Sequence, residues 1–202
     1  MSQFALPFAW PAVEDERDFC RGEANAAALR HLEHRALWPV MATLLTGPRK
    51  SGRSLLGRIF VAKAGATLID DAERRPEEEL FHAWNRAQAD RRPLLLIADA
   101  PPPAWHIRLP DLKSRIAATP HVAISEPDDA LAAALFERLL GQRGLAAAPD
   151  VIAYLLPRIE RSYVVILRVI DALDQLSLAR RSRVTVPLAR RALQTIGVID
   201  DS

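Results

Sequence analysis

The stretch "TGPRKSGRSLL", residues 46–56, joins a glycine-rich turn to the start of a helix and decides the fold. Four of its residues match the spacing Gly-x4-Gly-Lys-Ser/Thr with one substitution: Gly47, Gly52, Arg53 and Ser54. In such a loop backbone N–H groups surround phosphates, the lysine reaches the terminal ones, and the hydroxyl holds magnesium. A short apolar segment, residues 40–46, precedes the loop. The stretch therefore predicts a phosphate-binding loop between a strand and a helix.

Two cations make this loop unusual. Arg53 stands at the lysine position, and a planar guanidinium differs from a compact ammonium in bulk and in hydrogen-bond geometry. Lys50 lies where such loops usually have small residues, and a long side chain is disfavoured in the left-handed backbone that glycine adopts. We therefore expect weakened nucleotide binding and weak or absent intrinsic ATPase activity.

Strand and helix signals alternate through residues 40–125, which is typical of a parallel sheet covered by helices on both faces. Only fifteen residues, 55–69, separate Ser54 from Asp70, so a helix, a tight loop and one strand fill that interval. We predict an α/β module over residues 19–125 with a sheet of about four strands. The expected strands are 40–46, 65–71, 93–103 and 121–125, and the expected helices are 25–35, 54–62, 76–92 and 111–118.

After Ser125 the strand signals stop and helical patterns take over. Apolar residues recur at helical spacing between Val165 and Leu176, which predicts a small bundle, and residues 126–202 are expected to form an all-α lid domain. Residues 1–18 contain three prolines and little periodicity, so they are expected to form an extended arm. The expected helices of the lid are 127–142, 149–159, 162–181 and 186–196.

Composition narrows the function classes. The 202 residues carry 27 Lys and Arg against 25 Asp and Glu, and a net charge of +2 argues against a broad nucleic-acid surface. The single cysteine, Cys20, excludes an internal disulfide. Neither a secretory leader nor a membrane-length apolar run is evident, so we expect a cytoplasmic protein without membrane contact.

Several of these segments together resemble the AAA+ initiator group that contains DnaA and its short regulatory relative Hda. "TGPRKSGRS" is similar to the Walker A loop of that family, "LIDDAER" to its Walker B strand, and "LLLIADAPP" to its first sensor strand. "LPDLKSRI" resembles the segment that presents an arginine finger, and "RIERSYVVILRVIDAL" resembles the second-sensor helix. The resemblance extends over residues 19–193 and implies a P-loop AAA+ module followed by a helical lid.

The resemblance also implies roles for particular residues. The nucleotide-binding set is Gly47, Gly52, Arg53, Ser54, Asp70, Asp71, Asp99 and Arg161, with Ser54 and Asp70 on the magnesium side. Arg115 takes the position of an arginine finger that acts on a neighbouring molecule. ADP or ATP with Mg²⁺ is the implied cofactor, although Arg53 argues against tight binding.

Simpler interpretations of these residues stay open at this stage. Asp70 and Asp71 also suit acids that cap the following turn, and Asp99 suits a strand-end acid. Arg115 also suits a solvated arginine, and Arg161 a salt-bridge residue at a helix start.

The arm contains "QFALPF", which resembles the short peptide by which bacterial replication proteins bind the sliding clamp. Leu6 and Phe8 would be the apolar anchors, Pro7 would pre-order the backbone, and Gln3 would form a hydrogen bond at the rim. The alternative is an arm that packs onto its own core.

The family resemblance implies a regulator of replication initiation that binds the DNA-loaded clamp and stimulates ATP hydrolysis by DnaA. Alternatives are a nucleotide-binding switch or weak ATPase, and a DnaA-related, loader-like protein. Because the sequence ends soon after the last lid helix, we expect no helix-turn-helix and no sequence-specific DNA binding. Self-association is left open.

Overall fold

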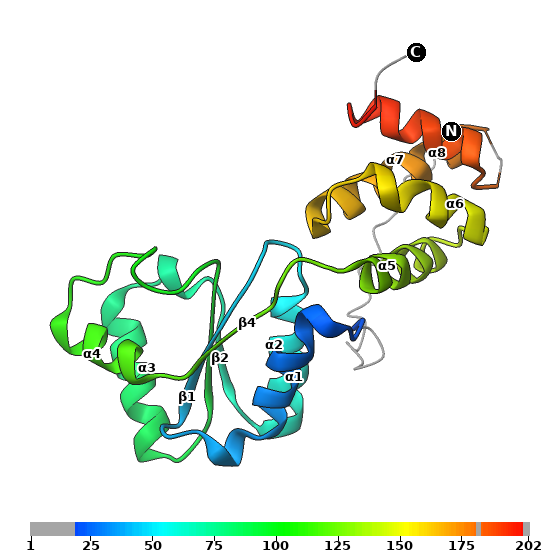
Figure 1. Cartoon of the computed structure of the whole chain (residues 1–202). Helices are drawn as coiled ribbons and strands as arrows, with labels where there is room; N and C mark the ends of the chain where they lie inside the picture. The colour runs from blue at the N-terminus through cyan, green and yellow to red at the C-terminus, as the bar shows by residue number, and fades with distance from the viewer. Residues whose placement is uncertain (1–18, 181–182, 200–202) are drawn as a thin grey trace, which may run out of the picture.

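A computed structural model of the chain describes residues 19–180 and 183–199. Figure 1 shows a sheet with its covering helices at one end of the molecule and a group of helices at the other. The first of these is the α/β module, and the second is called the helical part. The predicted combination of a P-loop α/β module with a C-terminal all-α region is confirmed.

The sheet of the α/β module has four parallel strands in the order β2-β3-β1-β4. All five residues of both central strands are buried, as expected of strands covered on both faces. The predicted number of strands is therefore confirmed. Their bounds are β1 (Ala42–Thr46), β2 (Thr67–Ile69), β3 (Leu94–Ala98) and β4 (His121–Ala123).

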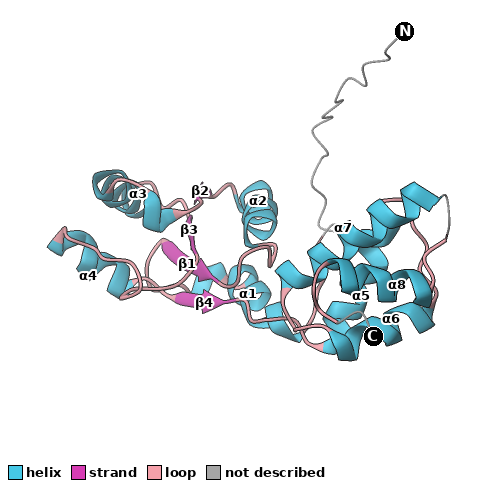
Figure 2. Cartoon of the chain, turned by 90° about the horizontal axis from the view of Figure 1, so that it is seen from above, coloured by secondary structure: helices cyan, strands magenta, loops and turns pink. Residues whose placement is uncertain are grey.

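Helices cover both faces of this sheet (Figure 2). Leu45, Leu95 and Ile97 point to one face, where they pack in a cluster with residues of α1 and α2. Leu44 and Leu96 point to the other face and pack with residues of α3 and α4. The alternation follows from the two-residue period of a strand. The helices are α1 (Glu23–Glu33), α2 (Arg53–Ala64), α3 (Glu77–Ala89) and α4 (Pro110–Ala118).

The helical part has a core of its own, in which Phe136, Leu140, Leu155 and Leu173 are fully buried. Such residues come from all of its helices, so no single helix of the group buries its apolar side alone. Among the described residues, no helix has the length and apolar character needed to cross a membrane. The helices are α5 (Asp129–Gln142), α6 (Pro149–Leu155), α7 (Tyr163–Arg180) and α8 (Val186–Thr195).

Left-handed residues explain two of the places where the observed bounds differ from the predicted ones. The helix after the glycine loop runs beyond residue 62 to Ala64, because Gly65 with φ 62° is the first residue that ends it. The strand predicted at 65–71 is only Thr67–Ile69, since Asp71 with φ 52° leaves the extended conformation. Both differences are a few residues at element ends, where local backbone geometry decides.

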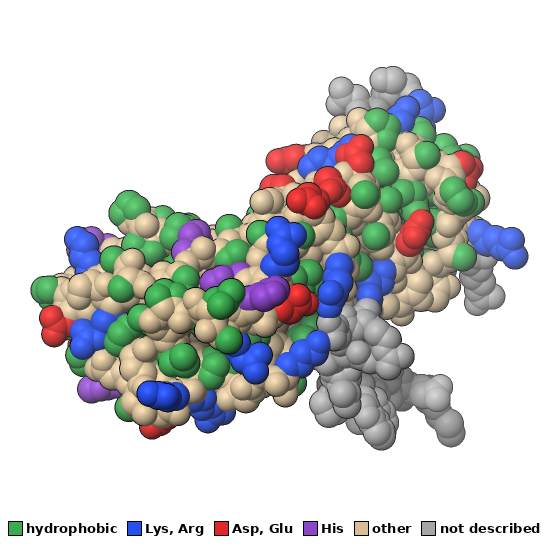
Figure 3. Space-filling view, turned by 60° about the horizontal axis from the view of Figure 1, so that its bottom comes forward, with side chains coloured by type: hydrophobic (Ala, Val, Ile, Leu, Met, Phe, Trp, Pro, Cys, Tyr) green, Lys and Arg blue, Asp and Glu red, His purple; other side chains and the backbone are tan. Residues whose placement is uncertain are grey.

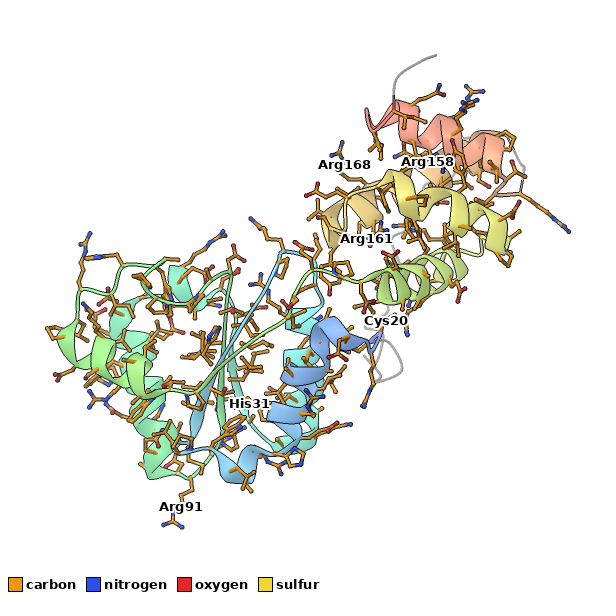
Figure 4. All side chains as sticks on the ribbon, in the orientation of Figure 1. Cys20, His31, Arg91, Arg158, Arg161 and Arg168 are labelled. Atoms are coloured by element: carbon orange, nitrogen blue, oxygen red, sulfur yellow. The ribbon has the colours of Figure 1, made fainter. Side chains whose placement is uncertain are left out.

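His31 of α1 forms a partly buried polar contact with the sheet (Figure 4). Its Nε2 lies 2.7 Å from Thr43 Oγ1, and that hydroxyl donates its own hydrogen to Pro120 O at 3.0 Å. Nε2 must therefore donate to Thr43, which fixes the neutral tautomer with its hydrogen on Nε2. The ring also stacks on Trp38 with centroids 5.2 Å apart. Burial lowers the pKa of His31, so α1 is attached to β1 by an uncharged imidazole.

Candidate functional site

The glycine loop, residues 47–52, connects β1 to α2 and has the backbone that its sequence predicts. Gly47 has φ 151°, and a Cβ there would lie 2.7 Å from the carbonyl oxygen of Ile124. Gly52 has φ 86°, and a Cβ there would lie 3.1 Å from the ring of Phe19. Lys50 adopts φ 67°, a left-handed conformation that is unfavourable for a long side chain. The loop thus retains its shape, although one of its residues is strained.

Arg53, at the lysine position of the motif, is directed at the end of β3. Its Nη1 donates to the carbonyl oxygen of Ala98, and its Nη2 donates to Asp99 Oδ1 at 2.6 Å. The Arg53 side chain is only 10% exposed, whereas that of Asp99 is 38% exposed. The structure therefore joins two residues of the predicted nucleotide-binding set in an ion pair.

Asp99 is surrounded by more charge than this single partner. The hydrogen bond from Arg53 holds the pKa of the Asp99 carboxyl below its usual range, and the charges of Arg53, Arg49 and Arg74 act in the same direction. The backbone N–H of Asp99 donates to Glu73 Oε1 at 3.2 Å. The other oxygen of Glu73 is buried and has no hydrogen-bond partner within the described residues.

Sequence reasoning did not identify Glu73 as a site residue. It lies in the turn after the predicted acidic pair, and nothing in its spacing distinguishes it from a surface glutamate. Only the adjacency of β2 and β3 brings it beside Asp99.

Asp70 and Asp71 follow β2, next to the strand that leads to Asp99. Asp70 Oδ1 accepts from the backbone N–H of Asp71 at 3.0 Å, and its carbonyl oxygen accepts from Arg75 Nε at 3.3 Å. Ser54 lies in the first turn of α2. Within residues 19–180 and 183–199, no group of three or more His, Cys, Asp or Glu side chains is arranged to hold a metal ion. These contacts are those of acids that organise a turn.

A cavity of about 410 Å³ lies beside the glycine loop, between the α/β module and the helical part. Ser51 of the loop lines it; this residue is only 5% exposed, and its Oγ has no hydrogen-bond partner among the described residues. Figure 3 shows Lys and Arg side chains gathered beside this junction. Phe19, Lys50, Leu131 and Tyr163 also line the cavity.

Arg161 does not line this cavity. Its Nε pairs with Asp129 Oδ1, and its Nη1 donates to the carbonyl oxygens of Leu156 and Ile159, the latter at 3.2 Å. Figure 4 shows Arg161 near the start of α7, on the side of α5. These contacts attach the turn before α7 to the start of α5, as the salt-bridge interpretation expects.

Arg115, the predicted finger, lies on α4 and is folded against α3. Its guanidinium carbon is 4.3 Å from the centre of the Phe81 ring and 5.4 Å from that of Trp84. Its Nε donates to Asn85 Oδ1 at 3.0 Å, and its Nη1 to Asp111 O at the same distance. The predicted clamp-binding residues Gln3, Leu6, Pro7 and Phe8 lie outside the described residues.

These positions test whether a nucleoside triphosphate with Mg²⁺ fits the loop. The cation that would reach the terminal phosphates is bonded within the chain to Ala98 and Asp99. Arg161, which the resemblance implies as a nucleotide-binding residue, is bonded to Asp129. In this conformation the residues present do not fit the terminal phosphates.

Comparison with solved structures gives the class of the fold. Domain III of the replication initiation protein DnaA from Thermotoga maritima superposes with a TM-score of 0.72 at 15% identity, over 89% of this chain and 95% of that domain. DnaA from Aquifex aeolicus bound to AMPPCP gives 0.64 at 17% identity, over 90% and 68%. RuvB from T. maritima gives 0.64 at 11% identity, over 90% and 72%. The fold is that of an AAA+ module followed by helices.

Comparison of sequences adds one family match and one relative. Residues 128–193 match the family described as "Hda, lid domain". An uncharacterised protein from Haemophilus influenzae is 29% identical over 118 residues, which are 58% of this chain and 51% of that protein. The match thus spans about half the length of that curated relative. Residues 128–193 are thus similar to the lid domain of Hda, and the chain as a whole has a fold like that of DnaA domain III.

Proposed function

We propose that the protein regulates chromosomal replication in the cytoplasm, by binding the DNA-loaded sliding clamp and stimulating ATP hydrolysis by DnaA. The match to the Hda lid domain and the likeness to DnaA domain III support DnaA as the partner. The ATP is then bound by DnaA, and the present chain contributes a single cation to it.

The position of Arg115 is the observation that carries this proposal. Arg115 lies on α4, which covers the face of the sheet opposite to α2 and its glycine loop (Figure 2). A guanidinium in this position is suited to a phosphate held by another molecule, where it stabilises the negative charge of the transition state. Contacts with Phe81 and Asn85 fix the side chain before the partner arrives.

In this proposal the arm, residues 1–18, binds the sliding clamp. The sequence Gln3 to Phe8 suits an extended peptide that docks its two apolar anchors in a groove of the clamp. Attachment to a clamp on DNA would raise the local concentration of Arg115 near DnaA. This increase requires no additional contact between the present chain and DnaA.

The test measures ATP hydrolysis by DnaA in the presence of clamp loaded on DNA. Arg115→Ala is expected to lower the stimulation on the order of a thousandfold, because the finger cation is lost. Lys113→Ala, an exposed residue of the same helix, is the matched control and should retain full stimulation. Both variants should still bind the clamp, and thermal unfolding checks that α4 stays folded without the contact to Phe81. Full stimulation by Arg115→Ala would refute the role of the arginine.

Deleting residues 1–8 tests the arm separately. The shortened protein is expected to lose association with the clamp in a pull-down, and thermal unfolding checks that the deletion leaves the protein folded. Undiminished association would exclude the peptide as the clamp-binding element.

The alternative function is a nucleotide-binding switch. The cavity beside the loop, with the unpartnered Ser51 hydroxyl, favours this alternative as the place for an uncharged part of a ligand. Two of the similar DnaA structures hold AMPPCP. Calorimetric titration with ADP and ATP distinguishes the two functions, since a regulator that works through Arg115 alone requires no bound nucleotide.

A further inference from the structure

We infer that Asp99 is an internal anion that occupies Arg53 and thereby excludes the terminal phosphates of a nucleotide from the glycine loop. This inference goes beyond the proposed function, which needs only Arg115 and the arm. It assigns to Asp99 a role in selecting ligands, namely against polyphosphates.

The guanidinium of Arg53 is held by two acceptors at the end of β3. Its Nη2 donates to the Asp99 carboxylate at 2.6 Å, and its Nη1 donates to the carbonyl oxygen of Ala98. With the side chain only 10% exposed, these two acceptors hold the guanidinium against the end of β3. A terminal phosphate that binds Arg53 must first displace the carboxylate, and charge-assisted bonds of this kind are among the strongest that a side chain makes.

A second acid, Glu73, lies beside the pair formed by Arg53 and Asp99. Glu73 Oε1 accepts from the backbone N–H of Asp99, so a second carboxylate borders the position that a phosphate would take. Glu73 Oε2 is itself buried and has no hydrogen-bond partner among the described residues, so solvent screens the charge at this oxygen only weakly. An incoming phosphate therefore meets repulsion from Glu73 as well as competition from Asp99.

The rest of the glycine loop still suits an anion. Gly47 and Gly52 retain the backbone of a phosphate-binding loop, and α2 begins directly after it. Arg49 and Arg74 lie close enough to Asp99 for their charges to lower its pKa. Removing the charge of Asp99 alone should therefore leave a loop with net positive charge and one released guanidinium.

The experiment is calorimetric titration of the full chain with ATP, ADP and inorganic pyrophosphate, each with Mg²⁺. The Asp99→Asn variant keeps the shape of the side chain but forms only a neutral bond to Arg53. Its dissociation constant for pyrophosphate is expected to fall at least about tenfold below that of the unchanged chain, with ATP and ADP following. An unchanged constant would overturn the inference.

Two further variants separate this effect from a general change in charge. Glu78→Gln removes the same charge from an exposed residue of α3 that has no described contact with Arg53, and it should leave the constants unchanged. The double variant Arg53→Ala, Asp99→Asn should lose the gain, because the released guanidinium is absent. An equal gain in either variant would also overturn the inference.

Asp99→Ser is a second route should Asp99→Asn fold poorly, and it has the same expected gain. Neither measurement contains DnaA or clamp, so its outcome is independent of whether Arg115 acts as a finger.

Discussion

Gly47 shows how much a single residue of the loop contributes to the fold. Its φ of 151° is unfavourable for any residue with a side chain, and an added Cβ would lie 2.7 Å from a backbone oxygen of residue 124. Gly47→Ala is therefore expected to lower the free energy of unfolding by about 2–4 kcal/mol, from strain and from the clash together. Urea unfolding followed by circular dichroism measures this change.

Gly141 is the matched control, because it lies within α5 and a Cβ there would have no atom within 4 Å. Gly141→Ala should raise the free energy of unfolding by about 0.5–1 kcal/mol, since alanine loses less backbone entropy in a helix. Equal effects of the two substitutions would contradict the described loop geometry.

At the residue scale, sequence spacing located the loop but not the partners of its charged side chains. The positions of Gly47 and Gly52 follow from the motif, because only certain backbone angles let a strand turn into a helix over a phosphate site. The direction of Arg53 depends on the end of β3, which is 45 residues away in sequence. The contact of Glu73 likewise depends on which strands are neighbours, and no local pattern contains this information.

At the element scale, Asp128 is a clear determinant of where α5 begins. Its carboxylate accepts from the backbone N–H of Leu131 at 2.7 Å, so it satisfies one of the free donors of the first turn. Asp128→Ala is expected to lower the free energy of unfolding by about 1 kcal/mol. Glu137→Ala, an exposed change in the middle of the same helix, should alter it by less than about 0.5 kcal/mol.

Thermal and urea unfolding of these two variants should be compared at one pH. A loss in Glu137→Ala as large as that in Asp128→Ala would show that the removal of a negative charge, rather than the loss of the cap, explains the effect.

The elements themselves were largely predictable, for reasons that differ along the chain. β3 is a continuous apolar run and β1 is a mainly apolar run with two threonines; each is bounded by glycine or proline, and such runs of strand length have few alternatives. The fifteen residues between Ser54 and Asp70 permitted one helix and one strand, which fixed the number of strands at four. The ends of β2 were less predictable, because a left-handed aspartate gives no distinctive signal in sequence.

At the scale of the whole molecule, the α/β module and the helical part are joined by shared packing. Leu131 of α5 and Tyr163 of α7 belong to the same buried cluster as Phe19 and Leu56 of the module. The hydroxyl of Tyr163 also donates to the carbonyl oxygen of Ser125, at 3.1 Å. The sequence placed a domain boundary near residue 125, but it could not show that residues on its two sides share one core.

The stability of this junction depends on pH through the side chain of Tyr163. Burial, followed by the charges of Glu126 and Asp128, raises the pKa of Tyr163 to about 12 from an ordinary value of 10.0. Between these values the unfolded chain has lost the phenolic proton while the folded chain retains it. The free energy of unfolding contributed by Tyr163 is therefore fully present below pH 10.0 and decreases as the pH rises towards about 12.

Tyr163→Phe tests this linkage and the junction together. The variant is expected to be about 1 kcal/mol less stable at neutral pH, because Ser125 loses its hydrogen-bond donor. Its stability should also decrease less than that of the unchanged chain between about pH 9 and about pH 11, since the group that titrates is gone. Absorbance of the phenolate gives a second readout, and the step near pH 12 should disappear in the variant. A tyrosine step that remains there, or an unchanged alkaline slope, would mean that Tyr163 is not buried between the two parts.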